Sequence, residues 1–400
     1  MICIFARKIT DELASLVKKV DEVVSLNEGR KMAGFVVLLA DEPKSVEQQL
    51  RAFAERNTLS RVSLTVFNGA AGPENYAIGG AATVTVMRWG GEKKLVSANY
   101  SVGNEKLDDV FIAKVVADVS EDNHHDGAVR VGVFNMRITI ERLKQIGTMT
   151  NVEVLDLQDV NLTASGLNHL ERLTKLRSLN LFRNKRLTDS AMDTLVKFSQ
   201  LEELNISSTQ ITNAGLGRLV GELTHLKKLN FRNTRTINDA GLKRLLQRPK
   251  LEVLLCGNTF ITDVGLAHIG ELSALQELEV RKTKITDNGL VHLAKLTNLR
   301  KLNCSDNNIT NDGVRHLSGL TGLQSLDLSQ ARINDAGIAS LKELTELNRL
   351  DLSKTRITGA GLRHVHRLRN LKFLNLFATQ ANDRDVVELQ RALPNCDILH

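Results

Sequence analysis

Apolar and polar residues follow a fixed pattern that recurs every 24 or 25 residues, from about Val152 to Phe377. Each unit follows the pattern L-x-x-L-x-L-x-x-T-x-I-T-D-x-G-L-x-x-L. Self-similarity at a fixed period of this length indicates a solenoid, in which each unit contacts only its neighbours. The ten units begin at Val152, Leu176, Leu201, Leu226, Leu251, Leu275, Leu299, Leu323, Leu347 and Leu371.

Each unit is predicted to form a short strand, a turn and a short helix. Apolar and polar residues alternate at Leu278–Val280, which is typical of a strand with one buried face. Thr286 and Asp287 suit a helix N-terminus, because their side-chain oxygens accept hydrogen bonds from free amides of the first turn. Leucines spaced by three in Gly289–Leu293 then indicate one buried face of a helix.

This pattern resembles that of the leucine-rich-repeat family, in its bacterial type with 24-residue repeats. The resemblance implies an α/β solenoid over residues 128–400, with a parallel sheet on the concave side and helices on the convex side. Degenerate segments at 128–151 and 381–400 are interpreted as terminal caps, which a stack requires at each end.

Residues 1–122 contain no repeat and alternate between predicted strands and helices, which indicates a mixed sheet flanked by helices. The predicted strands are 2–6, 34–41, 61–67, 82–88 and 93–100, and the predicted helices are 10–28, 45–56 and 105–119.

This order resembles the thioredoxin-like superfamily, with Ile2–Arg7 as first strand, a hairpin over Val84–Tyr100 and a closing helix containing Val115–Ala117. The redox cysteine pair of that superfamily is absent, because its expected position reads Arg7–Glu12 without a cysteine. A redox-inactive domain is therefore expected, followed by a polar linker at 123–127.

Composition narrows the classes of partner and the compartment. A formal net charge of +7 is mild for 400 residues and does not by itself indicate nucleic acid. The four cysteines form no disulfide framework. Neither a signal peptide nor an apolar run long enough for a bilayer is recognisable in the given chain. The default expectation is a cytoplasmic protein, or an exported one if a signal precedes the given start.

The outward-facing strand positions are the candidate binding residues. They place a polar row along the concave face, flanked by arginine and phenylalanine, which are enriched in protein interfaces. Acidic and basic residues balance in these rows, which argues against a groove for nucleic acid. The alternative is that asparagine and serine simply fill solvated strand positions. The candidates are Phe182, Asn205, Asn230, Arg232, Leu255, Glu279, Arg281, Asn303, Asp327, Arg349, Asp351 and Phe377.

Arg232 and Arg281 are expected to point to solvent on either side of an exposed Leu255, as the centre of an interface. Histidines recur at one helix position, including His268, His292 and His316 in consecutive units. Ligands spaced along a stack do not converge on one ion, so no metal site is predicted. No catalytic residues and no cofactor are predicted either.

The sequence thus predicts a non-enzymatic scaffold that binds a protein partner on its concave face. One alternative is a thioredoxin-like or peroxiredoxin-like redox protein that uses the single cysteine Cys3. The other is a substrate-recognition subunit of a larger complex.

Overall fold

The computed structural model describes residues 137–246 and 250–400 without a break, and before them six strands and helical residues within 13–21 and 49–56. The chain divides into two compact units, Met1–Asn184 and Lys185–His400. No helix in this described part is long and apolar enough to cross a membrane.

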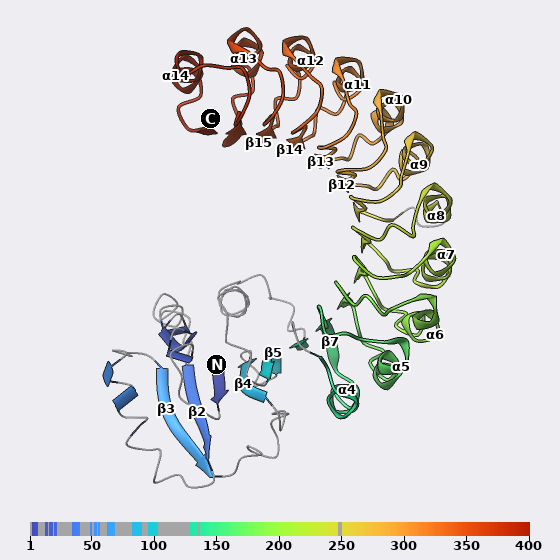
Figure 1. The fold of residues 1–400 in the computed structure, drawn as a ribbon, viewed down its shortest axis with the longest axis vertical. Coiled ribbons are helices and arrows are strands. Elements are labelled where there is room, and N and C mark those ends of the chain that lie inside the picture. Colours follow the sequence, from blue (N-terminus) through green and yellow to red (C-terminus); the bar gives the residue numbers. More distant parts are fainter. Residues whose placement is uncertain are drawn as a thin grey trace. The chain divides into compact units, whose positions relative to one another are not determined.

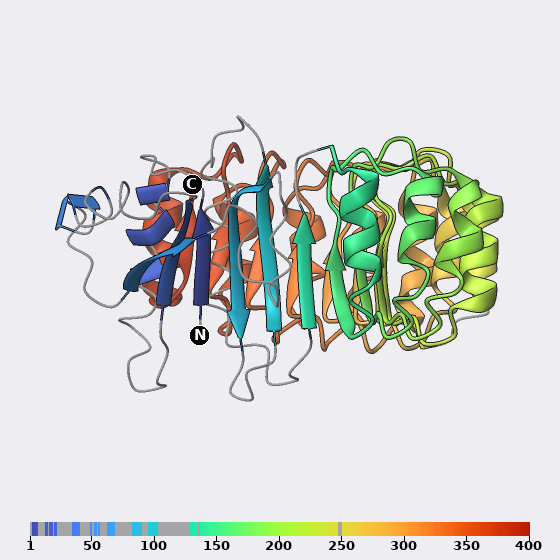
Figure 2. The same cartoon turned by 90° about the horizontal axis from the view of Figure 1, so that it is seen from below.

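The first unit contains a mixed sheet built around β1 (Ile2–Ala6). β1 pairs in parallel with β2 (Gly34–Ala40), which pairs in parallel with β3 (Val62–Asn68). On its other side β1 pairs antiparallel with β4 (Ala82–Trp89), and β4 pairs antiparallel with β5 (Leu95–Val102). The resulting strand order is β3–β2–β1–β4–β5, and the blue to cyan strands lie side by side in Figure 2.

These strands agree closely with the five predicted from the sequence, and the mixed sheet is confirmed. Helical residues within 13–21 and 49–56 fall inside two of the predicted helices. The third predicted helix, at 105–119, and the linker at 123–127 lie outside the described residues. The thioredoxin-like fold of residues 1–122 and the domain boundaries remain predictions.

The repeat pattern begins within the first unit. β5 pairs in parallel with β6 (Val129–Val133), β6 with β7 (Val152–Asp156) and β7 with β8 (Ser178–Asn180). The helices α4 (Ile140–Gly147) and α5 (Ala164–Leu167) follow β6 and β7. Residues 128–151, which were interpreted as a cap, thus hold β6 and α4, whose Leu143 and Ile146 are buried.

The second unit is a stack of short parallel strands and helices, with the strands on the inner side and the helices on the outer side of its arc in Figure 1. Its strands are β9 (Glu203–Asn205), β10 (Lys228–Asn230), β11 (Val253–Leu255), β12 (Glu277–Glu279), β13 (Lys301–Asn303), β14 (Ser325–Asp327), β15 (Arg349–Asp351), β16 (Phe373–Asn375) and β17 (Asp397–Leu399). Its α-helices are α6 (Met192–Leu195), α7 (Asn213–Glu222), α8 (Asp239–Leu245), α9 (Asp263–Ile269), α10 (Asp287–Leu290), α11 (Asn311–Arg315), α12 (Asp335–Ala339), α13 (Gly359–Val365) and α14 (Asp383–Ala392).

The strands of the second unit pair without a register shift, so equivalent residues lie beside one another. Leu254, Leu278 and Leu302 are consecutive partners, and each is at most 1% exposed. The middle residue of each strand therefore faces the core, and the first and third residues face away from it, because side chains alternate along a strand.

The Thr-Asp-x-Gly part of the repeat links neighbouring units by side-chain hydrogen bonds. The Asp263 carboxylate accepts from the backbone N–H and the hydroxyl of Thr286 in the next unit, both at 2.7 Å. A Cβ atom added to Gly289 would lie 2.5 Å from Asp263 Oδ1. Only glycine therefore lets the Asp263 carboxylate come this close to the helix. The same carboxylate–threonine pair recurs as Asp239–Thr262, Asp287–Thr310 and Asp335–Thr358.

Candidate functional site on the concave face

The third residues of the strands form one row along the concave face of the second unit. The register brings Asn205, Asn230, Leu255, Glu279, Asn303, Asp327, Asp351 and Asn375 side by side, in this order. The candidate Phe182 belongs to the first unit, where the Cζ atom of Arg183 lies 5.9 Å from its ring centroid. The structure therefore brings the seven row candidates together, as the sequence predicted.

Most polar side chains of this row are engaged by their own backbone. Asn205 Oδ1 accepts from Ser207 N–H at 3.0 Å, and Asp351 Oδ1 accepts from Ser353 N–H at 2.9 Å. The same bond to the residue two positions on recurs at Asn230, Asn303, Asp327 and Asn375.

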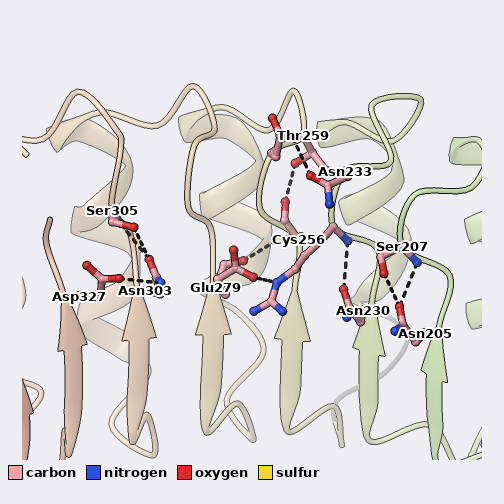
Figure 3. A network of polar contacts seen from close by, with 12 residues as sticks. Asn205, Ser207, Asn230, Asn233, Cys256, Thr259, Glu279, Asn303, Ser305 and Asp327 are labelled. Carbon is pink, nitrogen blue, oxygen red and sulfur yellow. Dashed lines mark hydrogen bonds and ion pairs between the residues drawn. The ribbon is translucent and has the colours of Figure 1, made fainter. Parts of the chain in front are cut away.

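Neighbouring strands are also joined within the row. Asn303 Nδ2 donates to Asp327 Oδ2 at 2.9 Å, and Asn375 Nδ2 donates to Asp351 Oδ2 at 2.9 Å (Figure 3 shows the first pair). The bonds from the backbone N–H two residues on fix the turn that follows each strand. Asparagine and aspartate therefore have a structural reason to occupy the row.

The arginine-flanked centre is arranged differently from the prediction. Leu255 is only 7% exposed, so it offers no apolar spot to a partner. Arg232 does not project freely into solvent, because its Nε pairs with Oε2 of Glu279 two strands away. Burial lowers the pKa of the Arg232 guanidinium from its ordinary value. Of the two predicted arginines, Arg281 is exposed and Arg232 is half-buried.

Gly257 makes room for this ion pair. A Cβ atom there would lie 2.1 Å from Oε1 of Glu279, whose side chain is 9% exposed. Serine occupies the equivalent position after β9, β13, β14 and β15. The glycine thus lets the Glu279 side chain lie over the turn, where the arginine reaches it. Sequence reasoning placed these residues in the right rows but missed the contact, because it depends on how far two long side chains reach.

The clearest exposed cluster lies near the C-terminal end of the concave face. Arg349 and Phe373 are register partners on β15 and β16, and the Arg349 Cζ atom lies 4.0 Å from the Phe373 ring centroid. Phe377, two residues beyond β16, is 53% exposed. A contact of this length places a cation over an aromatic face. We use the name arginine–phenylalanine cluster for the contacting pair Arg349 and Phe373, of which Phe373 is half-buried, together with the exposed Phe377 that follows the same strand. The sequence pattern places Phe373 in the row beside Arg349, but Phe373 was not among the twelve candidate binding residues.

The buried thiols are unsuited to nucleophilic chemistry. Burial raises the pKa of Cys256 and of Cys304, and it raises the pKa of Cys396 to about 11. All three are free and buried, and Cys256 Sγ donates to the Glu279 carbonyl at 3.3 Å. Cys3 lies in β1, but its side chain is outside the described part. The histidine row forms no group that could hold a metal ion, as far as the described side chains extend.

Comparison with known proteins agrees with this architecture. A family model described as leucine-rich repeat matches residues 172–196, 200–220, 222–246, 295–318 and 320–342. No curated protein matches the chain.

Among solved structures, an internalin, InlF, from Listeria monocytogenes is 25% identical with a TM-score of 0.51 and covers 67% of this chain and 71% of its own. TLR13, solved in complex with a single-stranded RNA, is 18% identical with a TM-score of 0.51 and covers 87% of this chain and 53% of its own. A Leptospira interrogans leucine-rich-repeat protein, LIC12759, is 15% identical with a TM-score of 0.47, and the match covers 92% of this chain and 90% of that protein. The chain therefore contains leucine-rich repeats, and no catalytic family is indicated by these matches.

Proposed function

We propose that the protein is a non-enzymatic scaffold that binds a protein partner on the concave face of its second unit. The observation that carries this proposal is the arginine–phenylalanine cluster. Arginine and aromatic residues dominate the binding energy of protein interfaces. Phe377 is 53% exposed, and a partner that covered it would gain from removing its apolar surface from water.

The concave face supplies a second element of recognition. Its carboxylates and amides are held in place by hydrogen bonds, as at Asp327 and Asp351, so they present fixed charges to a partner without first losing side-chain entropy. Arg281 adds an exposed positive charge in the middle of the stack, opposite in sign to these carboxylates. This mixture of fixed acids and exposed cations favours a protein surface over a phosphate backbone, which selects uniformly positive grooves.

The centre of the proposed interface lies at the arginine–phenylalanine cluster rather than at Arg232 and Leu255. Arg232 is engaged by Glu279, and Leu255 is buried. Asn205, Asn230 and Asn303 are assigned to the rim, because their side-chain oxygens already accept bonds from the turn backbone. Phe182, in the first unit, remains a candidate contact of its own.

The experiment that tests this proposal uses the full chain as an affinity ligand, followed by quantitative titration of a captured and purified partner. We expect the double variant Arg349→Ala with Phe377→Ala to bind at least about tenfold more weakly, as for removal of interface anchors. Val291→Ala is the matched control, because Val291 is an apolar residue that is 46% exposed at a helix of the convex side. A partner that binds the double variant as tightly as the wild type would contradict the proposal.

For residues 1–122 we further propose a thioredoxin-like domain without redox activity. The proposal rests on the strand order β3–β2–β1–β4–β5, in which β4 alone runs antiparallel to β1, and on the absence of a cysteine from Arg7–Glu12. Insulin reduction should stay at background, and activity that is lost in Cys3→Ser would contradict this assignment and restore the redox alternative. The role of subunit in a larger complex stays a prediction.

A further inference from the structure

One repeat, residues 251–274, exposes apolar side chains where other repeats are polar or small. Phe260 lies in the turn before α9 and is 46% exposed, and Val264 in the first turn of α9 is 60% exposed. Phe260 lies between β11 and α9, at the edge of the solenoid, and Val264 lies at the start of α9 beside that edge. In the other repeats of the second unit, the position of Phe260, directly before the buried Ile or Ala, is held by Gln210, Thr236, Lys284, Asn308, Arg332, Arg356 and Gln380.

Two cations from the adjacent repeats flank this phenylalanine. Lys284 Nζ lies 4.9 Å from the ring centroid of Phe260, and Arg235 Cζ lies 5.9 Å from it. The backbone N–H of Lys284 donates to Ile261 O at 2.8 Å, which holds the lysine beside the ring. Neither cation forms a salt bridge with any carboxylate of the described residues. Arg235 donates to the amide oxygen of Asn258 at 3.3 Å, its one side-chain hydrogen bond among the described residues.

The carboxylates nearest to this edge in the chain already have partners in the scaffold. Asp239 and Asp263 stand at the starts of α8 and α9, and each accepts two hydrogen bonds from a threonine of the next repeat. The two cations beside Phe260 are a small positive site, whereas a long phosphate backbone gains its affinity from many charge contacts. The groups that remain available to a partner are the apolar ring of Phe260 and the cations Arg235 and Lys284 beside it.

We propose that this edge, formed by Phe260, Val264, Arg235 and Lys284, binds an acidic segment of a partner protein in which an apolar side chain lies between carboxylates. The apolar side chain covers Phe260 and Val264, which removes their exposed surface from water. The flanking carboxylates pair with Arg235 and Lys284, whose heads already lie near the ring and need little reordering. This site is separate from the concave face and does not depend on the function proposed for it.

Fluorescence anisotropy with the full chain and labelled synthetic peptides tests the proposal. The first peptide carries a leucine between two pairs of glutamates, the second has alanine in place of the leucine, and a single-stranded oligouridylate serves as the third probe. We expect the leucine peptide to bind, and Phe260→Ala and Lys284→Ala each to weaken it at least about fivefold. The alanine peptide should bind the wild type more weakly by a similar factor, and salt should weaken both peptides.

Matched controls separate this edge from the rest of the molecule. Lys354→Ala removes another exposed cation of the solenoid edge, four repeats from Phe260 in the chain, and should leave peptide affinity unchanged. The concave double variant Arg349→Ala with Phe377→Ala should bind the peptide like the wild type, so failure of one proposal is distinguishable from failure of the other. No binding at about 1 mM peptide, the weak end of measurable affinity, would overturn the proposal. So would oligouridylate binding that depends on Phe260, or equal affinity in Phe260→Ala and wild type.

Discussion

Replacement of Gly289 by alanine should destabilise the solenoid, although alanine is the better helix former. Gly289 lies in the first turn of α10, against the carboxylate of Asp263 from the preceding repeat. An alanine Cβ would lie 2.5 Å from Asp263 Oδ1 and 2.9 Å from Leu266 Cδ1, both inside van der Waals contact. The carboxylate must therefore move away, and its two 2.7 Å bonds to Thr286 are lost or stretched.

The expected size follows from three opposing contributions. Overpacking a fitted site costs about 1–3 kcal/mol. Weakening a charged hydrogen bond costs roughly 1.5–3 kcal/mol. Glycine to alanine in a helix contributes up to about 1 kcal/mol of stability in return. We therefore expect Gly289→Ala to lower the free energy of unfolding by about 2–4 kcal/mol.

Urea denaturation followed by far-ultraviolet circular dichroism measures this change, and the chain offers a matched control. Gly221 is also helical, near the end of α7, but a Cβ atom there has no heavy atom within 4 Å. Gly221→Ala should be neutral or stabilising by up to about 1 kcal/mol. The same loss at both glycines would mean that backbone entropy, not the carboxylate contact, decides the effect.

A double-mutant cycle tests the cause directly. In an Asp263→Ala background the carboxylate is absent, so most of the clash at Gly289 disappears and the second substitution should cost about 1–3 kcal/mol less than in the wild type. Strict additivity of the two substitutions would refute the proposed contact.

Three further outcomes are expected. Leu278→Ala should lower the free energy of unfolding by about 2–5 kcal/mol, because the side chain is buried at mid-stack; an unchanged urea midpoint would place the residue at the surface. Arg232→Ala should destabilise by about 1–3 kcal/mol through the carboxylate that it leaves unpaired, whereas the exposed Arg281→Ala should be neutral within about 0.5 kcal/mol; equal urea midpoints for the two variants would argue against the ion pair. Cys256 and Cys304 should resist alkylation at about pH 8 until the chain is unfolded, since burial raises the pKa of both thiols and keeps them protonated; rapid labelling of the native protein, followed by mass spectrometry, would contradict this.

The sequence by itself determined the repeat architecture, because the same type of residue returns at the same position of each repeat. The alternation around Leu278 predicted a strand, and the spacing after Thr286 predicted a helix, and both are present in the structure. The expected side-chain cap is absent at Thr286, whose hydroxyl donates to Asp263 of the preceding repeat instead. The row from Asn205 to Asp351 followed from the same period, since equal repeats stack in register. The strands of the first unit were also predictable, because their apolar runs are bounded by turn residues.

Only the tertiary structure decided which outward side chains are available for binding. Arg232 and Arg281 occupy the same repeat position, yet one pairs with Glu279 and the other is exposed. That difference arises because Gly257 leaves room for a carboxylate within reach of a long side chain two strands away. Phe260 likewise gains its two cations from neighbouring repeats, at positions about a full repeat away in the chain. Periodicity fixes where a Cα atom lies, but the reach of a side chain and the space left by its neighbours are settled by packing across the stack.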